Sequence, residues 1–166
     1  SSDLKILKFN EKTTGYIEER KSEMNLPVDY IAVHIRRGDK IVSREMKELG
    51  LSLYIDAVKG KKHISRNVFI ATDDSSVKDE LKSILVAEGF NVYCNTAVTQ
   101  TGFDESLFNT KDKKSRYIDT LNMLLDMDIL IHSSFFIGTY TSNVSRIVPL
   151  YVGFGKSLSL DDEWKL

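Results

Sequence analysis

Short apolar runs that alternate with segments of helical periodicity constrain the fold of this chain most strongly. The runs are rich in Val, Ile, Phe and Tyr and end in polar or turn-forming residues, which is typical of strands buried on both faces. Strands that alternate with helices predict a parallel sheet with helices on both faces, a doubly wound Rossmann-like α/β fold. The predicted strands cover residues 30–35, 68–72, 91–94 and 135–138.

The intervals between the strands are assigned by periodicity and by start and stop residues. Residues 95–114 are polar and show no clear period, so a long loop is predicted there. Ser76 stands three residues before Asp79, a capping-box pattern that predicts the start of a helix. With these elements the chain forms one domain over residues 1–166. The predicted helices cover residues 11–24, 51–64, 76–88, 115–132 and 144–151.

Composition excludes several classes of protein. Twenty-three basic and 24 acidic residues give a formal net charge of −1, so the chain as a whole offers no electrostatic reason to bind nucleic acid or an anionic membrane. No apolar stretch reaches the roughly 18 residues that span a bilayer, and no membrane contact is expected from this segment. The single cysteine, Cys94, lies in an apolar run and is expected to be a small buried residue. Because the net charge is close to zero, any bound anion must be held by a local group of residues.

Three polar segments follow predicted strands: residues 34–40, 72–76 and 139–143. In open parallel sheets, ligands bind beyond the carboxyl ends of the strands, where these segments are expected to meet. His34 and Arg36 share strand parity, whereas Arg37 points to the opposite side. Two adjacent arginines at the end of a buried strand favour an anion such as a diphosphate, because guanidinium groups bind phosphate oxygens bidentately. The alternative is a structural cluster with carboxylates, for which Asp39, Asp73 and Asp74 are the candidates.

Residues 139–143 follow a strand and precede a helix. The hydroxyl and amide side chains of Thr141, Ser142 and Asn143 join backbone N–H groups at the positive end of the helix dipole, which is typical of an anion site. Ordinary helix capping by Ser142 or Asn143 explains part of the same pattern. The segment lacks the glycines and the lysine of a Walker loop.

Acidic residues at two further places are candidate ligands. On the predicted helix over 115–132, Asp119, Asn122 and Asp126 lie on one side, and Asp126 has apolar neighbours in the sequence. A carboxylate in that setting matches the two adjacent N–H donors of a guanine edge, although a solvated acid or a backbone cap is equally compatible. Asp73 and Asp74 have no evident third ligand for a metal and also fit a helix cap, so no metal is expected.

These segments resemble the motifs of a known family. Residues 34–40 (HIRRGDK) resemble the HxRRxDK motif of the α-1,6-fucosyltransferases, which protein O-fucosyltransferases and nodulation fucosyltransferases share more loosely. Residues 69–74 (FIATDD) and 138–146 (GTYTSNVSR) resemble the second and third motifs of that family. Residues 159–162 (SLDD) resemble the segment at which the α-1,6 enzymes leave the catalytic domain. The resemblance extends over about residues 15–162.

The resemblance implies the carboxyl-terminal, nucleotide-binding half of a GT-B glycosyltransferase, which transfers fucose from GDP-fucose to an acceptor hydroxyl with inversion and without a metal or other cofactor. The implied partners are GDP-fucose, a glycan or protein acceptor, and an amino-terminal half-domain of the same protein. By position, His34 and Asp126 would bind the guanine, and Asp73 and Asp74 would line the pocket. The implied phosphate ligands are Arg36, Thr141, Ser142 and Asn143.

The same resemblance suggests the catalytic groups. Arg36 would stabilise the negative charge that develops on the leaving diphosphate, and Arg37 and Lys40 would add to this field or position carboxylates. The candidate general bases are Glu45, displaced by one residue from the family pattern, and Asp39.

The chain also departs from the family. It covers only the nucleotide-binding half, and Asn143 replaces the usual glutamine and begins the sequon Asn143-Val144-Ser145. The alternative function is therefore a non-catalytic domain that binds GDP or a nucleotide sugar without the acceptor half. The compartment is not indicated: the resemblance implies the secretory lumen for a eukaryotic protein and the cytoplasm for a bacterial one.

Overall fold

The computed structural model describes residues 8–37, 49–97 and 102–165 of the chain. Its centre is a five-stranded, wholly parallel sheet with the order β3-β2-β1-β4-β5. This is the order of a doubly wound sheet, in which the connections leave β1 in opposite directions and create a crevice between the ends of β1 and β4. The predicted fold class is confirmed. The strands are β1 (Ile31–Ile35), β2 (Asn67–Thr72), β3 (Asn91–Cys94), β4 (Phe135–Gly138) and β5 (Ser157–Ser159).

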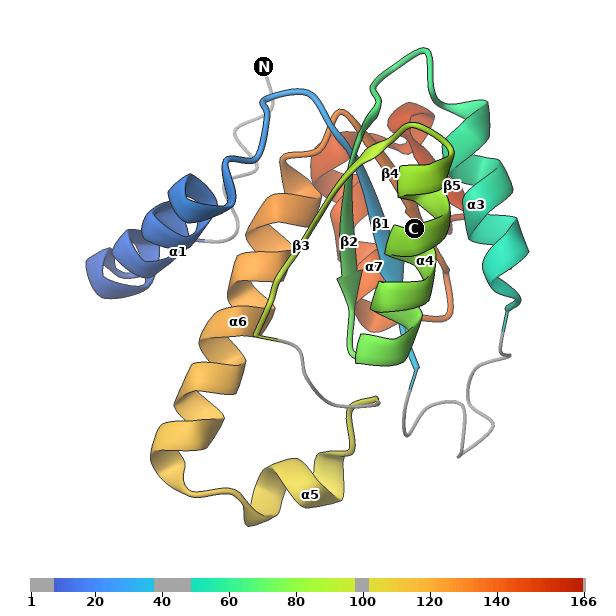
Figure 1. The fold of residues 1–166 in the computed structure, drawn as a ribbon. Helices are drawn as coiled ribbons and strands as arrows, with labels where there is room; N and C mark the ends of the chain where they lie inside the picture. The colour runs from blue at the N-terminus through green and yellow to red at the C-terminus, as the bar shows by residue number, and fades with distance from the viewer. Residues whose placement is uncertain (1–7, 38–48, 98–101, 166) are drawn as a thin grey trace.

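Helices cover both faces of the sheet, with α3 and α4 on one side and α1 and α6 on the other (Figure 1). The helix α7 packs against α6 and β4 on the second side. None of the helices in the described part of the chain is long and apolar enough to cross a membrane. The helices are α1 (Glu11–Met24), α3 (Leu51–Gly60), α4 (Ser75–Ala87), α5 (Glu105–Thr110), α6 (Lys113–Ile131) and α7 (Asn143–Val152), with a 3-10 turn η1 at Phe154–Lys156.

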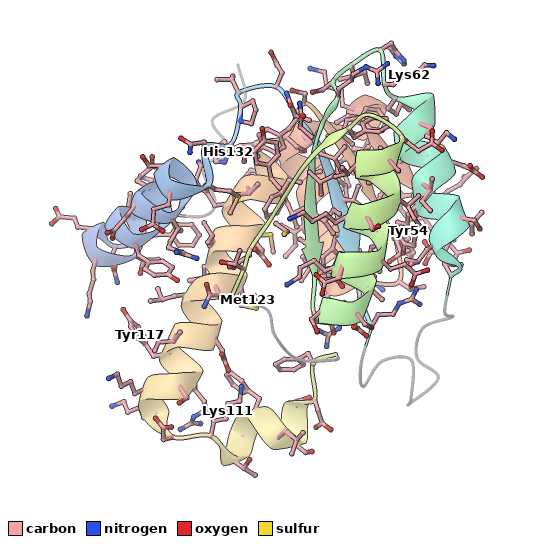
Figure 2. All side chains as sticks on the ribbon, in the orientation of Figure 1. Tyr54, Lys62, Lys111, Tyr117, Met123 and His132 are labelled. Carbon is pink, nitrogen blue, oxygen red and sulfur yellow. The ribbon has the colours of Figure 1, made fainter. Side chains whose placement is uncertain are left out.

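Strand alternation divides the core into two layers. Odd-numbered residues of β1, such as Ile31 and Val33, pack with α3 and α4, and Tyr54 of α3 belongs to this layer (Figure 2). Even-numbered positions, such as Ala32, pack with α6, α7 and Ile17 of α1. All of β1 is buried, as expected for the central strand of a sheet covered on both faces. The parity of β1 therefore decides which layer each residue at its end approaches.

Several sequence predictions need correction, among them the helix predicted over 51–64, which ends at Gly60. The predicted loop over 95–114 contains α5, which begins because the Asp104 side chain accepts hydrogen bonds from the amides of Ser106 and Leu107. The helix predicted to start at Ser76 begins one residue earlier, with Asp74 as its cap. The strand β5 was not predicted, and Cys94 is only partly buried because β3 lies at the edge of the sheet.

Candidate functional site

The polar strand ends meet at the carboxyl edge of the sheet. β1 pairs with β2 on one side and with β4 on the other. The segments that follow these three strands are therefore neighbours, as the parallel topology requires.

His34, near the end of β1, links this strand to the start of α7. Its Nδ1 atom lies 2.8 Å from the Oγ atom of Ser145, and the imidazole is buried. Burial lowers the pKa of His34 to about 3, and the positive charge of Arg36 acts in the same direction. His34 is consequently neutral at physiological pH and acts as a hydrogen-bonding group.

Arg36 follows β1 and is held by two neighbours. Its Nη1 atom lies 3.0 Å from Oδ2 of Asp73, and its guanidinium carbon lies 5.0 Å from the centre of the Phe103 ring. The Phe103 amide donates to the same Oδ2 atom at 3.0 Å. The pairing of Arg36 with Asp73 is the kind of contact expected for a structural cluster of arginines and carboxylates. It also fixes the plane of the guanidinium at the end of β1.

Arg37 points to the other layer, as its parity predicts. Its Nη2 atom donates to the Leu49 carbonyl, just before α3, at 3.0 Å. Its backbone amide donates to Oδ1 of Asp73 at 2.7 Å, so this carboxylate binds both arginine residues, one through its side chain and one through its backbone. Asp39, Lys40 and Glu45 lie outside the described residues.

The turn between β4 and α7 is bound by a carboxylate that follows the last strand, β5. Oδ1 of Asp161 accepts from the Tyr140 amide at 2.6 Å, and Oδ2 accepts from the Thr141 amide at 3.2 Å and the Thr141 hydroxyl at 2.6 Å. The Ser142 amide closes the turn by donating to the Thr139 carbonyl. The Thr141 hydroxyl is thus directed to Asp161.

The first turn of α7 has no side-chain cap. Ser142 occupies the cap position and is buried, yet its hydroxyl makes no capping hydrogen bond. Asn143 is exposed at the first helical position. Because the first amides of any helix lack intrahelical acceptors, the start of α7 presents N–H donors beside the end of β1.

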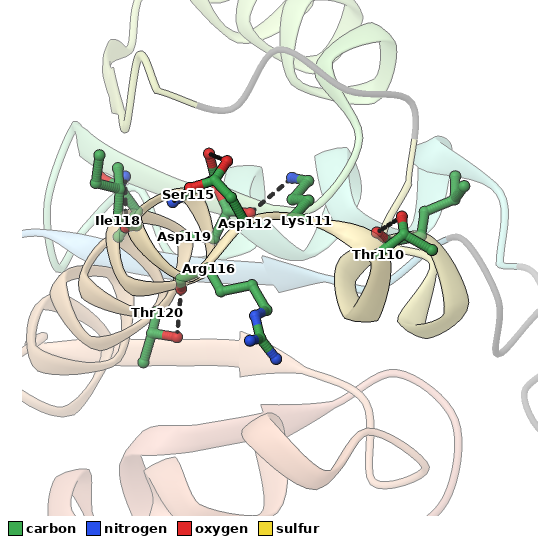
Figure 3. Close-up of polar contacts among 10 residues, drawn as sticks. Thr110, Lys111, Asp112, Ser115, Arg116, Ile118, Asp119 and Thr120 are labelled. Atoms are coloured by element: carbon green, nitrogen blue, oxygen red, sulfur yellow. Dashed lines mark hydrogen bonds and ion pairs between the residues drawn. The ribbon is translucent and has the colours of Figure 1, made fainter.

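Asp126 belongs to a polar group on α6. The Asn95 side chain, which follows β3, donates to Asp126 at 3.3 Å and to Asn122 at 3.2 Å, and the Tyr16 hydroxyl donates to Asn122 at 3.0 Å. Burial raises the pKa of Asp126 to about 7, and the bond from Asn95 only partly offsets this effect. Asp119 is not part of the group, because it pairs with Lys111 at 2.6 Å (Figure 3).

Asp74 acts as a helix cap. Its Oδ1 atom accepts from the amides of Ser76 and Val77 at the start of α4, which is the alternative that the sequence left open. Across residues 8–37, 49–97 and 102–165, no three His, Cys, Asp or Glu side chains gather into a group that could hold a metal ion.

Sequence reasoning missed four residues of this region, namely Asn95, Phe103, Ser145 and Asp161. Ser145 and Asp161 lie inside the motif-like segments 138–146 and 159–162, so those segments were a usable signal. Nothing local distinguishes Asn95 or Phe103, which depend on partners distant in the chain.

Comparison with known proteins places the chain in a family. The family described as "Alpha-(1,6)-fucosyltransferase N- and catalytic domains" matches residues 4–150. No curated protein matches significantly.

Solved structures share the fold. NodZ alpha-1,6-fucosyltransferase co-crystallized with GDP has a TM-score of 0.59 at 20% identity, and the match covers 87% of this chain and 43% of that chain. The Se-Met form of NodZ from Bradyrhizobium has a TM-score of 0.59 at 21% identity, with the same two coverages. POFUT1 in complex with GDP-fucose has a TM-score of 0.59 at 14% identity over 96% of this chain and 48% of that chain. This chain therefore spans less than half of the length of these structures. Because the family match covers most of the 166 residues, the chain belongs to the alpha-(1,6)-fucosyltransferase family.

Proposed function

We propose that this domain binds GDP-fucose and forms the donor half of an inverting, metal-independent fucosyltransferase. The observation that carries the proposal is the contact between His34 and Ser145, which brings the end of β1 and the first turn of α7 together at one edge of the sheet. Arg36 and the α7 amides there supply hydrogen-bond donors for a diphosphate. NodZ and POFUT1, which share the fold, have been solved with GDP or GDP-fucose bound.

The diphosphate would lie between Arg36 and the start of α7. Asp73 and the Phe103 ring hold the Arg36 guanidinium in a fixed plane, which lowers the entropy cost of binding phosphate oxygens. Ser142 and Asn143 contribute side-chain donors, and the first amides of α7 contribute backbone donors. Thr141 supports the same turn through its bonds to Asp161.

The guanine would lie toward α6. In its ionised form, the Asp126 carboxylate would accept hydrogen bonds from the two adjacent N–H donors of a guanine edge, and Asn95 holds this side chain in place. His34, neutral and fixed by Ser145, provides its second ring nitrogen on the same layer of the sheet. In this arrangement the base would be bound by α6 and the end of β1, and the phosphates by Arg36 and the start of α7.

Transfer with inversion requires an activated acceptor hydroxyl on one face of the fucose while the diphosphate leaves from the other. Arg36 would stabilise the charge that develops on the leaving group, and Arg37 would support it indirectly by fixing Asp73. Asp39, Lys40 and Glu45 stay as candidates for the general base and for further stabilisation, the roles that the resemblance suggests. A glycan or protein acceptor and an amino-terminal half-domain complete this proposal.

A second candidate is a GDP-binding domain without catalytic activity. The observation that favours it is the ion pair between Arg36 and Asp73, because an arginine already paired with a carboxylate stabilises the charge on a leaving group less. Fucose transfer by the intact native protein supports the first function. Binding of GDP-fucose without transfer by that protein supports the second.

Calorimetric titration with GDP tests both candidates at the binding step. Arg36→Ala is expected to weaken GDP binding by about 1.5–3 kcal/mol, or roughly 10- to 150-fold, because a charge-assisted contact is lost. Arg66→Ala is the matched control, because Arg66 is exposed and precedes β2 at the opposite edge of the sheet. Equal affinities of the two variants would remove Arg36 from the site.

A further inference from the structure

Asp161 is a heavily hydrogen-bonded carboxylate at this edge of the sheet. Besides the amides of Tyr140 and Thr141 and the Thr141 hydroxyl, it accepts from the Ser159 hydroxyl at 2.8 Å. Three of these donors belong to the turn that leads into α7. The carboxylate therefore joins the end of β5 to the turn between β4 and α7.

The position of Asp161 in the fold makes this link rigid. β5 pairs with β4, with Ser159 opposite Gly138, and the Leu160 amide donates to the Gly138 carbonyl at 2.9 Å. Asp161 follows immediately, so its backbone is fixed next to the turn that it binds. It also lies beyond residues 4–150, the part of the chain that matches the family.

The negative charge of Asp161 strengthens its hydrogen bonds to the turn. Burial alone would raise the pKa of Asp161, but the hydrogen bonds from Thr141, Ser159 and the backbone together hold it below its ordinary value. The carboxylate is thus ionised at neutral pH, and its bonds to the turn are charge-assisted.

We propose that Asp161 is a positioning residue that fixes the turn 139–142, so that the first amides of α7 face the diphosphate. This inference rests on the proposed function. Asp161 binds the amides that precede α7 and leaves the amides of its first turn to the ligand, which distinguishes it from a carboxylate that competes with phosphate for the same donors. Thr141 then shapes the turn, whereas Ser142 and Asn143 contact phosphate.

The test compares Asp161→Asn with Asp162→Asn. Both variants lose one negative charge at adjacent exposed positions, but it is Asp161 that accepts the hydrogen bonds from the turn. Titration with GDP and with guanosine separates phosphate recognition from base recognition. Hydrogen exchange of the Tyr140 and Thr141 amides, measured without ligand, reports the turn itself.

Asp161→Asn is expected to weaken GDP binding about tenfold, to change guanosine binding less than about twofold, and to accelerate exchange of the two amides. Asp162→Asn is expected to do none of these. Thr141→Val, which removes one donor only, is expected to show a smaller selective loss and serves if Asp161→Asn does not fold.

Several outcomes would overturn this inference. Tighter GDP binding by Asp161→Asn would identify a carboxylate that competes with phosphate, and equal losses for GDP and guanosine would identify a general structural role. Unchanged amide exchange would show that the turn does not depend on Asp161. Failure of the wild-type protein to bind GDP is a separate result, which overturns the proposed function and the phosphate role of Asp161 together.

Discussion

The helices α4 and α7 begin at the same edge of the sheet but treat their first amides differently. At α4, the cap residue Asp74 accepts from the amides of Ser76 and Val77. At α7, the cap residue Ser142 makes no such bond. The nearby carboxylate, Asp161, instead binds amides that precede the helix.

The difference shows that topology alone does not select a ligand site. The two helices follow β2 and β4, the strands on either side of β1, and both present a positive dipole end at the carboxyl edge of the sheet. At α4, the chain supplies its own anion, so an external phosphate would have to displace Asp74. At α7, Asp161 binds the amides that precede the helix, which leaves the helix start open to the external anion that we propose.

The strongest way to break the α7 arrangement is to fill the space at Gly138, where β4 meets the turn. A Cβ atom there would lie 2.6 Å from the Phe136 ring and 2.8 Å from Oγ of Ser145, the partner of His34. Gly138→Ala is expected to lower the free energy of unfolding by about 1–3 kcal/mol, as overpacking of a rigid core does. Urea unfolding measures the change.

Gly155→Ala is the matched control, because nothing lies within 4 Å of a Cβ atom at that position. Equal unfolding free energies for the two variants would mean that β4 and α7 move apart to accommodate the added Cβ atom without a loss of stability. In that case, close packing at Gly138 would not distinguish the start of α7 from the start of α4.

A pH series tests how α7 is attached to β1. The folded protein keeps His34 neutral down to a pKa of about 3, whereas the unfolded chain takes up a proton near 6.5, so the folded state loses stability relative to the unfolded state as pH falls through this window. The wild-type protein is expected to lose stability relative to His34→Asn by up to about 1.4 kcal/mol per pH unit. Urea unfolding between pH 7 and 4 provides the measurement.

The same comparison with His63→Asn, at an exposed position, serves as the control. Parallel curves for the wild-type protein and His34→Asn would show that α7 is not attached through a buried neutral imidazole. The start of α7 would then lack the buried histidine contact that is expected to distinguish it from the start of α4.

Much of the frame could be predicted from local patterns. β3 and β4 have the predicted bounds, since short apolar runs between polar segments describe buried strands directly. Strand parity placed His34 and Arg37 in opposite layers, as their bonds to Ser145 and Leu49 confirm. These features depend on neighbours in the sequence, and pattern reasoning captures them for that reason.

The remaining parts depend on partners far along the chain. β5 is short and exists through its pairing with β4, and Asp161 acquires its role through a turn 20 residues away. Asp73 and Asp74 also differ through their distant partners. Asp73 binds the arginines after β1, whereas Asp74 caps α4. No local pattern distinguishes two adjacent aspartates in that manner.

The smallest expected effect compares the two cap residues directly. Asp74→Ala removes an acceptor from two amides and is expected to cost about 1 kcal/mol of unfolding free energy, whereas Asp74→Asn, which is an equally good cap, is expected to recover most of this loss. Ser142→Ala removes no capping bond, so it is expected to cost less than Asp74→Ala. A larger loss for Ser142→Ala than for Asp74→Ala, measured by urea unfolding without ligand, would mean that the start of α7 is capped in solution. The region assigned to the diphosphate would then already be filled by the chain itself.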